Sequence, residues 1–166
     1  MADDVGSELG NMSRLILVVD DDPLILRLVE GLLVHANHRV HCVGNGKLAA
    51  EQIDAIKPDL ILSDLEMPEM GGLELVRMVA KRHPELPVVV FTGRGGEEEA
   101  VRCFRAGAAD YVSKTKLREE LVEVVHRILN DREMSAGSAE LLAVGDNDKG
   151  GGGADIDLEE NFLGLV

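Results

Sequence analysis

The chain has 166 residues, of which 45% are hydrophobic and 29% are charged, and it carries a formal net charge of −14. This composition suits one globular domain with additional terminal segments. Most of the acid excess lies near the two ends, and there is no basic stripe of the kind that binds a phosphate backbone. We therefore expect no direct binding to nucleic acid.

The sequence also bears on the compartment. It contains no apolar run of membrane-spanning length, and its N-terminus, MADDVGSELGN, is acidic where a secretion signal would be basic and then apolar. We expect a soluble, cytoplasmic protein with no membrane partner. Cys42 and Cys103 lack the paired spacing of a zinc or redox site, which favours two buried thiols in a reducing compartment.

Short apolar runs typical of strands alternate along the chain with longer segments of helical periodicity. Strands are predicted over 14–19, 39–43, 59–63, 87–91 and 110–113, and helices over about 23–36, 46–56, 72–82, 97–106 and 117–130. Pro23 suits the first turn of a helix, and Asp22 is placed to cap it. Continuous apolar strands joined by helices predict an α/β fold, a doubly wound parallel sheet with five strands.

Chemically complementary side chains follow four of the five predicted strands. Because ligands bind beyond the carboxyl ends of strands in such sheets, these side chains define a candidate site: Asp20, Asp21, Asp64, Thr92 and Lys114. Carboxylates at close range repel one another unless a cation binds them, and an all-oxygen site suits Mg²⁺. A carboxylate can also attack a phosphoryl group. We expect Asp64 to be this nucleophile, with Lys114 and Thr92 neutralising the transferred group.

Four motifs, VVDDDP, DLEMPEMGGLEL, FTGRG and DYVSK, resemble in order and spacing the receiver domain of two-component response regulators, the family of the stand-alone chemotaxis regulator. The resemblance covers roughly residues 14–133. It implies the flavodoxin-like (βα)5 fold with strand order 2-1-3-4-5. It also implies a phosphorelay protein rather than an enzyme, in which Asp64 accepts a phosphoryl group from a sensor histidine kinase or a histidine phosphotransfer protein. By the same resemblance, Mg²⁺ would bind Asp20, Asp21, Asp64 and the backbone carbonyl of Glu66.

The resemblance further implies a two-state switch. Thr92 would move toward the phosphoryl oxygens, Tyr111 would turn inward behind it, and the surface made by the fourth helix, fifth strand and fifth helix would change. An unknown downstream protein, or a second copy in a homodimer, would bind that surface. Glu66 and Arg94 would flank the site, where their opposite charges could pair across its mouth and slow self-dephosphorylation.

One position departs from the family pattern, because Thr115 follows Lys114 where the family normally has proline after a cis bond. Either the Lys114–Thr115 bond is cis, at a cost of about 2.5–4 kcal/mol, or the loop takes a trans path. The departure keeps open a receiver-like scaffold that is never phosphorylated. A further alternative is a phosphohydrolase with an aspartate nucleophile. Its catalytic residues would be aspartates of the DDDP run, but Pro23, which follows them, departs from the pattern of that class.

The histidines give no further site. His126, within VVHRIL, is interpreted as an ordinary histidine on a helix face rather than a phosphotransfer residue. His35, His38 and His41 straddle a helix end and a strand, so their spacing does not place three imidazoles on one face, and a metal site there is not expected.

The chain is expected to divide into four parts. An acidic N-terminal extension (1–13) precedes the receiver domain (14–133), which is followed by a flexible glycine-rich acidic linker (134–154) and a short amphipathic tail (155–166). The residues after the receiver are too few for a DNA-binding output domain. The tail carries apolar residues at i, i+4 and i+7, and it either docks on the switch surface or is disordered.

Overall fold

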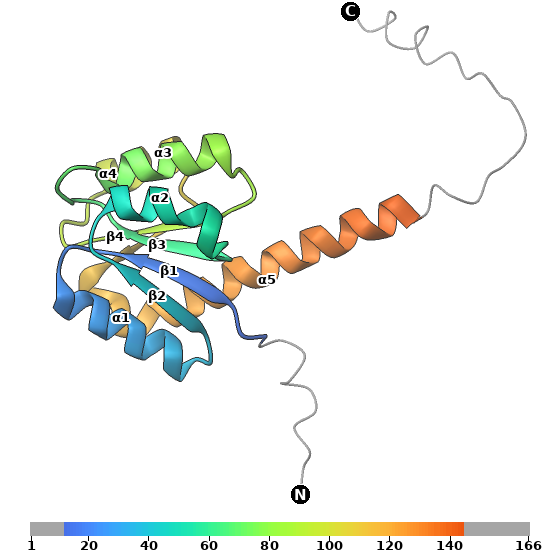
Figure 1. Cartoon of the computed structure of the whole chain (residues 1–166), viewed down its shortest axis with the longest axis horizontal. Coiled ribbons are helices and arrows are strands. Elements are labelled where there is room, and N and C mark those ends of the chain that lie inside the picture. The colour runs from blue at the N-terminus through green and yellow to red at the C-terminus, as the bar shows by residue number, and fades with distance from the viewer. Residues whose placement is uncertain (1–11, 145–166) are drawn as a thin grey trace, which may run out of the picture. The chain divides into compact units, whose positions relative to one another are not determined.

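The structure, a computed structural model, describes residues 12–144. In this range, five strands alternate with five α-helices (Figure 1). The strands are β1 (Leu15–Val19), β2 (Arg39–Val43), β3 (Leu60–Asp64), β4 (Val88–Thr92) and β5 (Asp110–Ser113). The helices are α1 (Pro23–His35), α2 (Gly46–Ile56), α3 (Gly72–Arg82), α4 (Glu97–Ala106) and α5 (Leu117–Val144), and a 3-10 helix, η2 (Lys114–Lys116), precedes α5.

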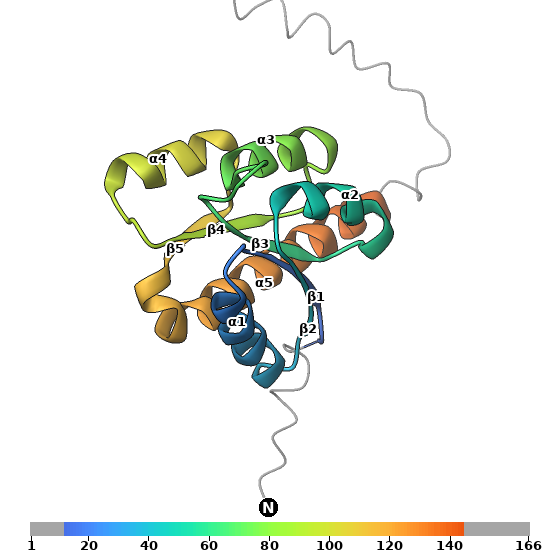
Figure 2. The same cartoon turned by 60° about the vertical axis from the view of Figure 1, so that its left-hand side comes forward.

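The five strands form one parallel sheet in the order β2-β1-β3-β4-β5. Helices α2, α3 and α4 cover one face, and α1 with the first part of α5 covers the other (Figures 1 and 2). Both the doubly wound parallel sheet predicted from the apolar pattern and the strand order implied by the resemblance are confirmed.

The core consists of two apolar layers, one on each face of the sheet. Successive side chains of a strand point to opposite faces, so Ile16 and Val18 join the layer with α1 and α5, while Leu17 and Val19 join the other. All four side chains are fully buried. Burying one such side chain contributes roughly 1.5–3 kcal/mol, which explains why the inner strands β1 (LILVV) and β4 (VVVFT) are nearly continuous apolar runs, whereas the edge strands β2 and β5 include charged and polar residues.

Helix α1 begins as its sequence predicts. The Asp22 side chain accepts a hydrogen bond of 2.9 Å from the backbone N–H of Leu24, and Pro23 occupies the first helical position. Proline there needs no partner for a backbone N–H, and its φ angle already suits the helix. The cap fixes where the chain turns away from the end of β1.

Helix α5 differs from the expectation. It continues to Val144, whereas we expected it to end near residue 130 and a flexible linker to begin at residue 134. The physical reason is composition: Ala, Leu, Met and Glu dominate residues 134–144 and favour a helix, and the glycine-rich run lies further on. The remaining linker (145–154), the tail (155–166) and residues 1–11 lie outside the described residues.

The chain divides into two compact units at Arg132. The first contains the whole sheet, both apolar layers and α5 as far as Arg132. The described part of the second unit is the C-terminal portion of α5. Between residues 12 and 144, no helix combines the length and the apolar character needed to cross a membrane.

Candidate functional site

Three carboxylates meet at the carboxyl edge of the sheet, where sequence analysis placed them. Asp20 and Asp21 follow β1, Asp64 ends β3, and β1 and β3 are parallel neighbours. One oxygen atom from each of the three side chains lies within 4.8 Å of the others. Asp20 is fully buried and Asp64 is 4% exposed, whereas Asp21 reaches the solvent. The cluster is therefore open on one side.

Lys114 reaches this cluster from the end of β5. Its Nζ atom lies 3.0 Å from Asp20 Oδ2 and 3.3 Å from Asp64 Oδ1, and 5.6 Å from the centre of the Phe91 ring. No cis peptide bond occurs in residues 12–144, so the Lys114–Thr115 bond is trans. The departure from the family pattern at Thr115 thus leaves the lysine in contact with both carboxylates.

Burial and the neighbouring charges act in opposite directions on the pKa values of the two buried carboxylates. Burial raises the pKa of Asp20, although the Asp22 backbone N–H and Lys114 act against it. Burial and the charge of Asp20 raise the pKa of Asp64, against the attraction of Lys114. Burial by itself lowers the pKa of Lys114, but its two carboxylate partners raise it on balance. One lysine therefore only partly compensates two buried acids.

One carboxylate oxygen of Asp20 can still accept a hydrogen bond or bind a cation. Its Oδ1 accepts a hydrogen bond of 2.8 Å from the Asp22 backbone N–H. Its Oδ2 is buried and lies in an ion pair 3.0 Å from Lys114 Nζ, and no hydrogen-bond partner for it is found among the described residues. A buried anionic oxygen beside two further carboxylates fits a small hard divalent cation such as Mg²⁺.

Thr92 and Tyr111 lie against the connection between β4 and α4. Thr92 is 2% exposed, and its Oγ1 accepts from the Arg94 backbone N–H (3.2 Å) and donates to the Arg94 carbonyl (3.4 Å). The Tyr111 hydroxyl is buried without a hydrogen-bond partner in the described part of the chain. It lies 3.0 Å from the position that a Cβ atom on Gly95 would take. The same short loop therefore contacts both side chains.

Glu66 and Arg94, predicted to flank the site, are both exposed. We expected that their opposite charges could pair, but within residues 12–144 the structure shows no ion pair between them. The backbone N–H of Glu66 acts on the site instead, because it favours the charged form of Asp64 and so acts to lower the pKa of Asp64.

Sequence analysis missed the importance of Gly72. A Cβ atom at this position would lie 2.2 Å from the Asp64 carbonyl oxygen and 2.8 Å from Leu65 Cα. Only glycine allows the first turn of α3 to pack this closely against the end of β3. The available signal was the Gly71–Gly72 pair, which we interpreted only as part of a family motif.

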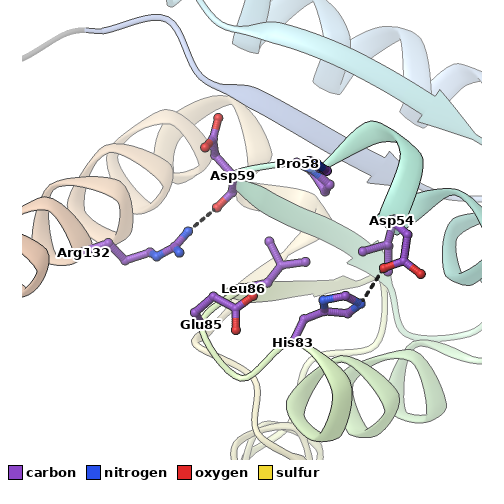
Figure 3. Close-up of a pocket in the computed structure, with 9 residues that line it drawn as sticks. Asp54, Pro58, Asp59, His83, Glu85, Leu86 and Arg132 are labelled. Carbon is purple, nitrogen blue, oxygen red and sulfur yellow. Dashed lines mark hydrogen bonds and ion pairs between the residues drawn. The ribbon is translucent and has the colours of Figure 1, made fainter.

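A pocket of about 330 Å³ opens near the opposite edge of the sheet, before the start of β3 (Figure 3). His83 Nε2 pairs there with Asp54 Oδ1 at 3.2 Å, and Arg132 Nη1 donates to the Asp59 carbonyl at 2.8 Å. None of the predicted site residues lines this pocket. The candidate functional site is therefore the carboxylate cluster and not this pocket.

The family described as the response regulator receiver domain matches residues 16–126 of the chain. The regulatory protein AtoC of Escherichia coli is 34% identical over 119 residues, which make up 72% of this chain and 26% of AtoC. The DNA-binding response regulator MtrA of Mycolicibacterium smegmatis is 33% identical over 138 residues, or 83% of this chain and 59% of MtrA.

Solved structures agree with these sequence matches. A CheY-like receiver domain protein from Methanospirillum hungatei superposes with a TM-score of 0.70 and 27% identity, covering 75% of this chain and 99% of that one. NtrX from Brucella abortus gives a TM-score of 0.78 and 30% identity, covering 92% of this chain and 34% of NtrX.

The chain belongs to the receiver domain family of two-component response regulators. The recognition made from the four motifs is thereby confirmed. The chain spans 26% of AtoC and 59% of MtrA, so each match concerns only part of a longer protein.

Proposed function

We propose that this chain is a phosphorelay receiver in which Asp64 accepts a phosphoryl group from a phosphohistidine on a sensor histidine kinase or a histidine phosphotransfer protein. The observation that carries the proposal is the position of Lys114, whose Nζ lies within 3.3 Å of Asp64 Oδ1 and 3.0 Å of Asp20 Oδ2. A nucleophilic carboxylate, a second carboxylate and a fixed cation thus lie in one partly open site.

In the transfer step, an Asp64 carboxylate oxygen forms a bond to phosphorus while the bond between phosphorus and the donor imidazole nitrogen breaks. The electron pair of the broken bond stays on the imidazole. The protein supplies positive charge and hydrogen-bond donors to the phosphoryl oxygens. Lys114 already lies beside Asp64, and the Thr92 hydroxyl would exchange its bonds with Arg94 for a phosphoryl oxygen.

Asp20, Asp21, Asp64 and the Glu66 carbonyl would hold Mg²⁺ in this proposal. When bound, Mg²⁺ supplies positive charge that offsets both the carboxylates and the phosphoryl oxygens. The oxygen-only donor set and the buried Asp20 Oδ2, which has an ion pair but no hydrogen-bond partner among the described residues, support this assignment.

The signal would pass from Thr92 to Tyr111 through the β4–α4 loop that contacts both. The surface of α4, β5 and the first part of α5 would then bind a downstream protein or a second copy of the chain. Exposed Val101 and Phe104 on α4, 45% and 48% exposed, support a protein partner there. The protein would act in the cytoplasm as a phosphoacceptor rather than an enzyme.

Intact mass measurement after incubation with acetyl phosphate and Mg²⁺ tests the proposal. Wild type is expected to gain the mass of one phosphoryl group, and to gain none when EDTA replaces Mg²⁺. Asp64→Asn should gain none under any condition. Asp54→Asn is the matched control, because it removes an exposed carboxylate of α2 that belongs to no part of the cluster and should leave the adduct unchanged.

Absence of an adduct on wild type, with acetyl phosphate and with a phosphorylated histidine phosphotransfer domain, would contradict the proposal and favour the unphosphorylated scaffold. An adduct followed by rapid multiple turnover of acetyl phosphate would instead favour the phosphohydrolase alternative.

A further inference from the structure

Two histidines form a hydrogen-bonded pair that joins the connection between α1 and β2 to α5. Helices α1 and α5 cover the same face of the sheet (Figure 2). His38 lies in the connection between α1 and β2 and is 6% exposed, whereas His126 lies on α5 and is half-buried. Their Nε2 atoms are 3.0 Å apart, and their rings meet edge to face at 65° with centroids 5.1 Å apart. The bond therefore links α5 to a connection 88 residues earlier in the chain.

A second hydrogen bond fixes which nitrogen of each neutral ring carries the proton. The backbone N–H of Arg14 donates to His38 Nδ1 at 3.3 Å, so His38 Nδ1 carries no proton. Neutral His38 then carries its proton on Nε2 and donates it to His126 Nε2. His126 must accept on Nε2, so its own proton lies on Nδ1.

Any proton added to the pair removes one of these two hydrogen bonds. A proton on His126 Nε2 faces the N–H of His38, and the bond between the rings is lost because two donors meet. If His38 moves its proton to Nδ1 to accept from His126, that proton faces the Arg14 N–H, and the other bond is lost. The neutral pair alone satisfies both bonds.

The charges around His38 also oppose a proton. Burial is the main cause that lowers the pKa of His38, and His126 on α5 and Arg14 before β1 act in the same direction. Asp59, before β3, acts the other way, but its carboxylate already accepts from the Leu15 backbone N–H at 2.8 Å and pairs with Arg14. Half-buried His126 is the member of the pair that water reaches more easily.

We propose that His38 and His126 form a pH-sensitive latch, which holds α5 to the α1–β2 connection and the start of β1 while both imidazoles are neutral and loosens that hold when the pair binds a proton. The latch acts on the helix that completes the α1 side of the core, since Leu121, Val125 and Leu129 of α5 pack there. Protonation therefore changes how firmly α5 packs without involving the carboxylate cluster.

Amide hydrogen exchange of the full chain at two pH values, on either side of the ordinary histidine pKa of about 6.5, tests the proposal. After correction for intrinsic exchange rates, protection of the amides of residues 121–129 and of Arg14 is expected to fall roughly fivefold on the acidic side, the factor that one net hydrogen bond supplies. His126→Gln should show no such fall over residues 121–129, because the glutamine oxygen does not titrate and accepts from His38 Nε2 whether His38 is neutral or protonated.

His35→Gln is the matched control, since it removes an exposed imidazole at the end of α1 and should keep the wild-type pH dependence. Equal protection of wild type at both pH values, or the same fall over residues 121–129 in His126→Gln as in wild type, would overturn the latch. Nitrogen NMR of wild type gives an independent measurement. It should find the His38 proton on Nε2 and the His126 proton on Nδ1 near neutral pH, and a His38 proton on Nδ1 would also overturn the proposal.

Discussion

At the residue scale, the single positive charge of one lysine partly compensates the negative charges of two buried carboxylates. This imbalance of charge determines how substitutions in the site affect stability. Lys114 contacts both Asp20 and Asp64, and its side chain is 20% exposed. Breaking a buried ion pair by removing one partner is costly because the other charge stays buried, whereas relieving repulsion between like charges is favourable. Substitutions of the lysine and of a carboxylate should therefore have opposite effects on stability.

Lys114→Gln is expected to lower the free energy of unfolding in EDTA by about 2–3 kcal/mol, less than for a fully buried pair because the lysine partly meets solvent. Urea unfolding measures the change. Excess Mg²⁺ should recover much of the loss, because a bound cation replaces part of the missing charge. Equal unfolding midpoints for wild type and variant in EDTA would show that Lys114 does not compensate the buried acids.

Asp20→Asn is expected to stabilise the protein in EDTA at neutral pH, by on the order of 1 kcal/mol. Burial raises the pKa of Asp20 above its ordinary value of 3.8, so the folded state binds its proton more tightly than the unfolded state does. Ionising Asp20 therefore costs stability as pH rises from 3.8 through the raised folded value. The advantage of the variant should vanish below 3.8, where wild-type Asp20 is protonated in both states.

The same variant should lose most of the stabilisation that Mg²⁺ gives wild type, so the order of the two proteins is expected to reverse in excess Mg²⁺. Urea unfolding with EDTA and with Mg²⁺, at neutral and acidic pH, measures all four cases. If Asp20→Asn were less stable than wild type in EDTA at neutral pH, the net destabilising effect assigned to the Asp20 charge would be wrong.

At the element scale, the junction of β3 and α3 holds Asp64 in place. The Gly72 backbone N–H donates to the Leu65 carbonyl at 2.9 Å, and the space that a Cβ atom on Gly72 would occupy is filled by the Asp64 backbone. Any larger residue must therefore move α3 or the end of β3. Since Asp64 ends β3, such a movement also changes the site.

Gly72→Ala is expected to destabilise the protein by about 1–3 kcal/mol through overpacking and to slow phosphorylation by acetyl phosphate. Gly31→Ala is the matched control. Gly31 lies within α1, a Cβ atom there would have no neighbour within 4 Å, and alanine should stabilise the helix by roughly 0.5–1 kcal/mol. Thermal unfolding of the two variants measures both effects, and a Gly72→Ala protein as stable and as reactive as wild type would contradict the close-packing account.

The elements themselves could be predicted well from the sequence, because strands buried on both faces read as continuous apolar runs and the helices between them keep a clear apolar face. The end of α5 could not. Ala, Leu and Glu favour a helix but are also common in linkers. Residues 134–144 show no amphipathic periodicity, so a prediction based on that periodicity did not assign them to the helix. Asp22 was predictable as a cap because capping depends only on neighbours in sequence.

At the scale of the whole molecule, the carboxylate cluster could be predicted because parallel strands end at the same edge of the sheet. The His38–His126 bond could not, because it joins residues 88 apart whose surroundings in sequence show nothing unusual. The failed pairing of Glu66 and Arg94 has a similar origin. Opposite charges near one site do not pair unless the backbone brings them together, and exposed side chains gain little from doing so.

The two core layers draw on residues between Ile16 and Leu129, so the first compact unit, which ends at Arg132, contains a complete core. A chain that stops after Arg132 is expected to unfold cooperatively, with a free energy of unfolding within about 1 kcal/mol of the full chain. Urea unfolding of the two chains measures the difference. Loss of a cooperative transition in the shorter chain would show that residues beyond Arg132 are needed for folding.

Mapping the phosphoryl group to a residue tests the central claim most directly. Reduction of the phosphorylated protein with borohydride converts an aspartyl phosphate into homoserine, and fragment mass spectrometry then locates the changed residue. The account predicts homoserine at position 64 alone, only after incubation with Mg²⁺ and a phosphodonor. Homoserine at position 20 or 21, or no conversion in a sample that carries the phosphoryl mass, would contradict Asp64 as the acceptor.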